Sequence, residues 1–209
     1  MQRINRVVWA KETLDIIASG QYTAGTHTHH LGPAIAQSVQ QTTLWLPEAL
    51  QALADTVLAD SLADYLANSS ANHSPNNPGT ANHHLPTRVG KISVVNGSTL
   101  AGARRLALAG PDVPGVLNFA SARNPGGGFL GGSQAQEESL ARSSALYASQ
   151  TSAIAAPYYE YHRANSSLLY SDRTILTPAC PVFRADDGSL LEAPYLVHFL
   201  TAAAPNAGA

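Results

Sequence analysis

Two adjacent glutamates, Glu137 and Glu138, follow a glycine-rich segment near the middle of the chain. Side-chain carboxyls of this kind can transfer protons in catalysis, or fix the hydroxyls of a bound ligand. Neighbouring residues on a helix diverge by about 100°. We therefore expect the two carboxylates to do different work, one aimed at the reacting bond of a ligand and the other at one of its hydroxyls.

The segment around these glutamates predicts a strand, a loop and a helix in succession. Residues 116–119 form a short apolar run, which is typical of a buried strand. Residues 124–132 hold five glycines and one proline, so they must form a loop. Residues 134–149 contain no glycine or proline and are mostly helix formers. In an α/β sheet this order presents free backbone N–H groups and a helix N-terminus at the carboxyl edge, where phosphates bind.

An ordinary helix cap is the competing explanation for the same residues. Ser133 and Gln136 have the spacing of a capping box, and the helix dipole favours carboxylates in a first turn. Three consecutive glycines, which let a backbone take positive φ and approach a ligand closely, are not needed before a simple cap. Their coupling to two adjacent acids favours a functional site.

The spacing of these residues resembles the signature of the poly(ADP-ribose) glycohydrolases, which is three glycines, a short spacer and Gln-Glu-Glu. In this chain the spacer between Gly128 and Gln136 has seven residues. Residues 117–125 and 142–147 are similar to the bacterial, microbial-type branch of that family. The resemblance covers roughly residues 9–209, and it implies a macrodomain with an added N-terminal segment.

The resemblance also implies a substrate and a set of roles. The substrate is poly(ADP-ribose), cleaved at its ribose–ribose O-glycosidic bonds to release ADP-ribose. Glu138 matches the family's catalytic glutamate, acting first as a general acid and then as a base for water. Glu137 matches the second glutamate, which holds ribose hydroxyls near the bond. The expected substrate-binding residues are Gln136, Asn118, Asn124, Gly126, Gly127 and Gly128. The resemblance requires no metal and no cofactor.

Two other functions remain open on the sequence. One is a non-catalytic reader of ADP-ribose, because macrodomains also bind ADP-ribose with glycine-rich loops and a fold does not fix a function. Readers need no paired glutamates after the loop, so Glu137 and Glu138 favour an enzyme. The other is removal of single ADP-ribose groups from proteins in the same pocket. ADP-ribosylated proteins are accordingly among the expected partners.

The composition limits the other partners and the compartment. The chain has 209 residues with 12 basic and 14 acidic side chains, a net charge of −2, which argues against a non-specific grip on a polyanion. Cys180 is the single cysteine, so an intrachain disulfide is excluded, and this fits a cytoplasmic protein. The sequence contains no run of about 18 apolar residues, so it predicts no membrane-spanning helix.

Composition predicts a linker over residues 68–87, which is rich in Asn, Ser, Pro and Gly. With the resemblance it implies two domains, a helical N-terminal extension with this linker over residues 1–87 and a macrodomain-like catalytic domain over residues 88–209. Within the first, residues 5–19 are expected to form a helix that ends at Gly20, and residues 50–66 have amphipathic helical spacing. The histidine-rich segment 26–30 is expected to be a solvated loop, since no cysteine or carboxylate nearby completes a metal site.

The second domain is expected to be α/β, with a mixed sheet flanked by helices. Residues 91–95 alternate as a strand, residues 100–109 follow as a helix, and residues 115–119 form the next strand. These three elements predict a βαβ unit with parallel strands. Farther along, Asp187 and Gly188 predict the turn of a hairpin.

The resemblance also leads to an expectation about completeness. In the family, a further strand–loop–helix unit follows, carrying a second glycine-rich diphosphate loop and an aromatic residue that stacks on adenine. Neither feature is found before Ala209. We therefore expect the catalytic domain to lack its C-terminal part, so that the chain is a fragment or is completed by a second polypeptide.

Overall fold

The computed structural model describes residues 2–71, 92–165, 167 and 169–205. The chain forms two compact units. One combines Met1–Leu46 with Gly97–Ala209, and the other is Pro47–Asn96, which contains the helix α3 (Pro47–Ala71). Most of the linker expected over residues 68–87 lies outside the described residues. None of the described helices is long and apolar enough to cross a membrane.

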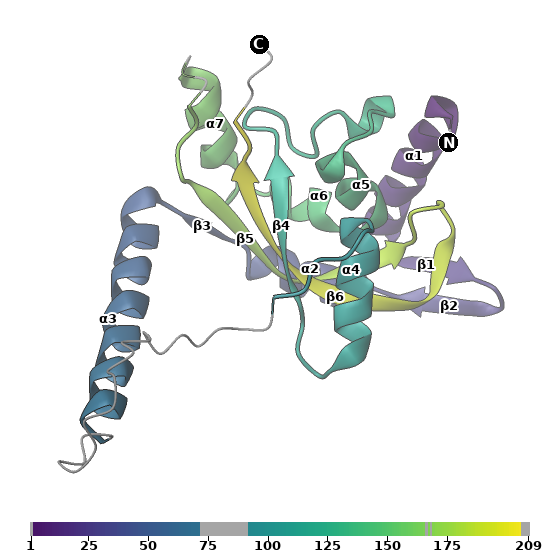
Figure 1. Ribbon diagram of the computed structural model, residues 1–209. Coiled ribbons are helices and arrows are strands. Elements are labelled where there is room, and N and C mark those ends of the chain that lie inside the picture. Colours follow the sequence, from purple (N-terminus) through teal and green to yellow (C-terminus); the bar gives the residue numbers. More distant parts are fainter. Residues whose placement is uncertain (1, 72–91, 166, 168, 206–209) are drawn as a thin grey trace. The chain divides into compact units, whose positions relative to one another are not determined.

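The larger unit is built on a mixed sheet of four strands (Figure 1). Their order is β3-β5-β6-β4, where β3 is Thr43–Trp45, β4 is Gly115–Ala120, β5 is Thr174–Arg184 and β6 is Leu190–Ala203. Strand β5 runs antiparallel to both of its neighbours, whereas β4 and β6 are parallel. The expected α/β class with a mixed sheet flanked by helices is confirmed.

The parallel pair determines where the functional residues can gather. Gly115 pairs with His198 and Ala120 with Ala203, so the carboxyl ends of β4 and β6 lie side by side. Ligands of open α/β sheets bind beyond such ends. The side chains of β4 alternate between the core and the surface. Leu117 and Phe119, on the outward face, are 46% and 57% exposed.

The expected strand over residues 91–95 is wrong for its described part. Residues 92–95 have no regular secondary structure, and Ile92 and Val94 are 84% and 93% exposed. The parallel partner of β4 is β6, which lies about eighty residues later in the chain. Alternation of apolar residues permits a strand, but a strand forms only where another strand satisfies its backbone hydrogen bonds.

The N-terminal region begins with the expected helix. Helix α1 (Arg3–Ser19) ends at Gly20, whose φ of 68° supplies the left-handed cap. The loop expected for the histidine-rich segment is wrong, because residues 27–30 form β2 (His27–His30), which pairs with β1 (Gln21–Ala24) in a two-stranded hairpin. Helix α2 (Gly32–Gln40) follows. No group of three His, Cys, Asp or Glu side chains in the described parts could hold a metal ion.

The remaining helices surround the sheet and the glycine-rich loop. They are α4 (Thr99–Ala109), the short 3-10 helix η1 (Phe129–Gly131), α5 (Gln136–Ser143), α6 (Leu146–Gln150) and α7 (Ala156–Ala164). The single helix expected over residues 134–149 is therefore two helices. The break comes at Ser144, which forms a β-bridge with Val182, and at Ala145, whose N–H donates to the Pro181 carbonyl.

One large apolar cluster unites the N-terminal region with the sheet. It joins buried side chains of α1, β1, α2, α4, α5 and α6 to those of β4, β5 and β6, among them Ile16, Tyr22, Ile35, Leu100, Val116, Leu140, Leu146, Phe183, Val197 and Phe199. A smaller cluster joins Tyr158 and Tyr159 of α7 to Ile175 of β5. The predicted hairpin is also present, since Arg184 and Leu190 pair across the turn.

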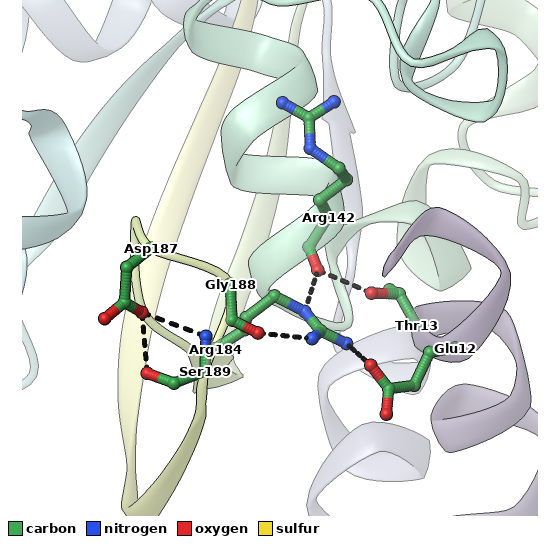
Figure 2. Close-up of polar contacts among 7 residues, drawn as sticks. All are labelled: Glu12, Thr13, Arg142, Arg184, Asp187, Gly188 and Ser189. Atoms are coloured by element: carbon green, nitrogen blue, oxygen red, sulfur yellow. Dashed lines mark hydrogen bonds and ion pairs between the residues drawn. The ribbon is translucent and has the colours of Figure 1, made fainter. Parts of the chain in front are cut away.

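A buried arginine connects α1, α5 and the hairpin (Figure 2). Arg184 is 2% exposed and donates to the carbonyls of Arg142 and Gly188, at 3.3 and 2.8 Å. Its remaining guanidinium nitrogen lies 2.8 Å from a carboxylate oxygen of Glu12. The Thr13 hydroxyl of α1 donates to the same Arg142 carbonyl. The N-terminal helix is thus docked on the sheet domain.

These contacts predict unequal effects of two substitutions on stability. Arg184→Leu leaves the buried Gly188 carbonyl without this donor and removes one of the two donors to the Arg142 carbonyl, and should lower the free energy of unfolding by about 3 kcal/mol. Glu12→Gln keeps an acceptor on a half-exposed side chain and should cost about 1 kcal/mol or less. Urea denaturation, with the exposed Glu160→Gln as a control, measures both. Equal losses for the two variants would contradict this account of the network.

Candidate active site

The carboxylate of Glu137 is buried and held by two donors. The side chain is 3% exposed, at the start of α5. Its Oε2 accepts a hydrogen bond from the Ser121 backbone N–H at 2.6 Å, just beyond the end of β4. Its Oε1 accepts from Nε2 of Gln150, the last residue of α6, at 2.9 Å. The orientation of the carboxylate is therefore fixed from two different elements.

The carboxylate of Glu138 points to a different neighbour. Its Oε1 accepts from the Gly128 backbone N–H at 3.0 Å. Its Oε2 is buried and has no hydrogen-bond partner among the described residues. A buried carboxylate oxygen normally has a partner, so an unpartnered one at a concave site is a candidate for contact with a ligand. The divergence of the two glutamates agrees with their adjacent positions on the helix.

The glycine-rich loop lies directly against both carboxylates. Gly127 has a φ of +57°, and a Cβ there would come within 2.5 Å of Glu138 Oε1 and 3.1 Å of Glu137 Oε2. The N–H of Gly127 donates to the Asn124 carbonyl, and that of Gly128 donates to Glu138. The expectation of free N–H groups is therefore wrong for these two glycines. The lack of a side chain makes room for the carboxylates at Gly127 and for the Ser133 side chain at Gly128.

A cavity of about 450 Å³ opens beside the two glutamates. It is lined by Phe119, Ala120, Ser121, Ala122, Arg123, Asn124, Ala135, Glu137, Glu138, Tyr170, Ala204 and Pro205. Its wall thus comes from the carboxyl end of β4, the start of α5 and the chain after β6. Of the residues expected from the sequence, Glu137, Glu138 and Asn124 line the cavity.

Gln136 and Asn118 do not line this cavity. Gln136 Nε2 donates to the Leu117 carbonyl at 2.7 Å, and its Oε1 accepts from the Phe119 N–H at 2.8 Å, so the side chain fixes the start of α5 to β4. Asn118 is fully buried and donates to the Thr201 hydroxyl at 3.2 Å. The capping-box alternative is wrong, because Ala135 is the N-cap and no side chain caps the helix.

Burial perturbs the acidity of Glu137. Loss of solvent raises the pKa of this carboxyl from 4.5 to about 7. The Ser121 N–H, the Gln150 amide and a smaller contribution from Asn118 oppose that rise, because each favours the charged form. The neighbouring Glu138 raises the pKa slightly further by repulsion. Near neutral pH both forms of Glu137 are populated.

Several residues of the site were not found from the sequence. Ser121 supplies an N–H to Glu137, and its hydroxyl accepts from the N–H groups of Arg123 and Asn124, at 3.3 and 3.1 Å. A serine just after a strand is a recognisable turn signal, so this role had a trace in the sequence. Gln150 and Tyr170 had none, since each comes to the site only through the packing of a later element.

The close approach at Gly127 predicts that even one methyl group disturbs the site. Gly127→Ala adds a Cβ at positive φ in contact with Glu138, and should lower the free energy of unfolding by about 1–3 kcal/mol. Gly102→Ala in α4 is the matched control, because its Cβ would meet nothing within 4 Å. The control should gain about 0.5–1 kcal/mol. Urea denaturation showing the same change in both variants would refute the contact.

The raised pKa of Glu137 predicts a pH-dependent stability. The carboxyl titrates near 4.5 when unfolded and near 7 when folded, so ionisation disfavours the folded state. That penalty is absent below about pH 4.5 and grows to about 3 kcal/mol as the pH rises through 7. Glu137→Gln cannot ionise, so its stability relative to the wild type should increase from pH 5 to pH 8. Urea denaturation at both pH values measures this, and a constant difference would contradict it.

Comparisons with known proteins identify the family of the chain. Residues 10–185 match the family described as microbial-type PARG, catalytic domain. A structure of poly(ADP-ribose) glycohydrolase from Thermomonospora curvata, bound to the inhibitor ADP-HPD, has 41% identity and a TM-score of 0.74; the match covers 96% of this chain and 63% of that one.

The same enzyme from Deinococcus radiodurans, in complex with ADP-ribose, has 39% identity and a TM-score of 0.62, over 84% of this chain and 59% of that one. The chain thus spans about three fifths of the length of these relatives. A search of curated proteins found no match. By its family match and its identity to these structures, the chain belongs to the microbial-type poly(ADP-ribose) glycohydrolase catalytic-domain family.

Proposed function

We propose that this chain carries the catalytic glutamates of an enzyme that hydrolyses ribose–ribose O-glycosidic bonds in poly(ADP-ribose) and releases ADP-ribose. The observation that carries the proposal is the environment of Glu138. One of its carboxyl oxygens is fixed by the Gly128 N–H, while the other has no hydrogen-bond partner in the described part of the chain and lies beside a cavity of about 450 Å³. A general acid needs this combination of a fixed orientation and one oxygen available to the substrate.

The reaction uses Glu138 twice. The protonated carboxyl gives its proton to the leaving 2′ oxygen of one ribose as the bond from that oxygen to the anomeric carbon of the next ribose breaks. Water then attacks the anomeric carbon, and the Glu138 carboxylate takes a proton from that water. Because Oε1 is engaged by Gly128, the proton is carried on Oε2.

The neighbouring residues hold the substrate. Glu137 binds ribose hydroxyls, since each of its oxygens has a second lone pair beyond the bonds to Ser121 and Gln150. Asn124 contributes from the cavity wall. The backbone of residues 126–128 lets the ligand approach Glu138 closely. Asn118 and Gln136 act indirectly. Asn118 is hydrogen-bonded to Thr201, and Gln136 fixes the start of α5 to β4.

The expected domain division and partners belong to the same proposal. The partners are poly(ADP-ribose), ADP-ribose and ADP-ribosylated proteins, encountered in the cytoplasm. A second polypeptide is a further proposed partner, and the exposed Leu117 and Phe119 on β4 offer it an apolar surface. We retain residues 1–87 as an extension and residues 88–209 as the catalytic domain, although β3 of the extension pairs with β5 of the catalytic sheet.

The proposal predicts that Glu138→Gln separates catalysis from binding. Loss of the general acid should slow the release of ADP-ribose from the polymer by about 10²- to 10⁴-fold. ADP-ribose affinity, measured by calorimetry, should stay within a few-fold of the wild type. The exposed Glu160→Gln serves as the control. Near-normal turnover by the Glu138 variant would remove this residue from the mechanism.

The wild-type chain itself distinguishes the alternative functions. Polymer and a mono-ADP-ribosylated protein are offered as separate substrates, and the released ADP-ribose is measured. Release from the polymer supports the proposal. Binding of ADP-ribose without release from either substrate would identify a reader, and release only from the mono-modified protein would identify a different hydrolase.

A further inference from the structure

Gln150 is a buried residue of the site that the proposed reaction does not use. Its side chain is 0% exposed at the end of α6, and its Nε2 donates to Glu137 Oε1 at 2.9 Å. Its own Oε1 is also buried, with no hydrogen-bond partner among the described residues. Buried polar atoms are normally hydrogen-bonded, so a buried amide whose carbonyl oxygen has no donor calls for an explanation.

The two partners of Glu137 differ in what they can do. The Ser121 backbone N–H, 2.6 Å from Oε2, can only donate, so Oε2 remains an acceptor whatever the protonation state of the carboxyl. A proton on Glu137 therefore belongs on Oε1, the oxygen that faces Gln150. A primary amide has both a donor and an acceptor. Rotation of the Gln150 amide by half a turn exchanges its nitrogen and oxygen.

We propose that Gln150 is a positioning residue that holds Glu137 in one orientation in both its charged and its neutral form. With the carboxylate, the Gln150 N–H donates to Oε1. With the carboxylic acid, the rotated amide presents its oxygen and accepts the proton of Oε1. One hydrogen bond replaces another, and Glu137 does not move. The inference rests on the proposed function, in which Glu137 holds ribose hydroxyls.

The surroundings of Glu137 explain why both of its protonation states must be held in place. The titratable groups that interact with Glu137 are Glu138 on its own helix, and Tyr158 and Tyr159 on α7. Burial raises the pKa of both tyrosines well above the usual range, so their hydroxyls stay neutral. The pKa of Glu137 is about 7, so the protein samples both of its forms under ordinary conditions.

A fixed Glu137 then serves the substrate in either form. The Ser121 N–H and the Gln150 amide occupy the same positions, and the acid proton is directed at Gln150. The remaining lone pairs of Glu137 still accept hydrogen bonds from ribose hydroxyls. The neutral form also removes a negative charge beside Glu138 and the substrate's diphosphate. An apolar side chain at position 150 could support neither form.

The first test measures the Glu137 carboxyl directly, by carbon-detected NMR titration of the full chain. Gln150→Met keeps the size of the side chain and removes both hydrogen-bonding groups. The amide bonds both forms of Glu137, but its bond to the charged carboxylate is the stronger, so its loss should raise the pKa of Glu137 by no more than about one pH unit. Gln37→Met, an exposed glutamine on α2, is the matched control and should leave it unchanged. A rise of about two pH units or more in folded Gln150→Met would show that the amide serves the charged form alone, and would overturn the proposal.

A second measurement needs no variant at Gln150 and so does not depend on its folding. The side-chain amide protons of Gln150 in the wild type should titrate with the same midpoint as Glu137, because the amide changes from donor to acceptor. Amide signals that stay constant across the Glu137 titration would contradict rotation.

Binding connects the inference to the substrate. The affinity of Gln150→Met for ADP-ribose should be about tenfold below that of the wild type. The loss should be similar at pH 6 and at pH 8, because the charged and the neutral form of Glu137 both lose the hydrogen bond from Gln150. Wild-type affinity at both pH values would overturn a positioning role. The NMR results need neither ligand nor turnover. Failure of polymer hydrolysis by the wild type would therefore reject the proposed function without altering the test of Gln150.

Discussion

Burial of two neighbouring carboxylates is the constraint around which the site is built. Negative charge away from water must be met by hydrogen-bond donors. Glu137 takes the N–H of Ser121 and Glu138 takes that of Gly128, so the chain from 121 to 128 must bring both donors back to a single turn of α5. Only glycine at position 127 permits this path, because its φ is positive and both carboxylates lie against it.

The helix that carries these carboxylates is held at both ends. At its start Gln136 is bonded to the backbone of β4. Near its end the Arg142 guanidinium donates to the Ser133 carbonyl and to Gln134 Oε1, at 2.7 Å each, which closes the segment before the helix onto it. The Arg142 carbonyl is in turn held by Thr13 and by Arg184. The N-terminal helix therefore contributes to the geometry of a site that it does not line.

Local chemistry in the sequence predicted the elements that depend on local signals. Gly20 ends α1, the Asp187-Gly188 turn joins β5 to β6, and the order of strand, glycine loop and helix is present. Features set by distant partners could not be predicted. Residues 92–95 alternate like a strand but pair with none of the described strands, and α5 stops early because Ser144 bridges to Val182. Gln150 belongs to this second kind, because only the break before α6 brings its amide to Glu137.

The position of Gln136 also affects how the edge of the sheet can pair with another chain. Within the described sheet β4 is an edge strand, and an edge strand offers unpaired N–H and carbonyl groups to any other chain. The Gln136 amide occupies the Phe119 N–H and the Leu117 carbonyl, the groups that an incoming strand would use, beside two exposed apolar side chains. The Gln136 side chain, which fixes α5 to β4, thus forms hydrogen bonds that a neighbouring strand would otherwise make. It thereby protects the exposed edge of β4 from pairing with a second copy of the chain.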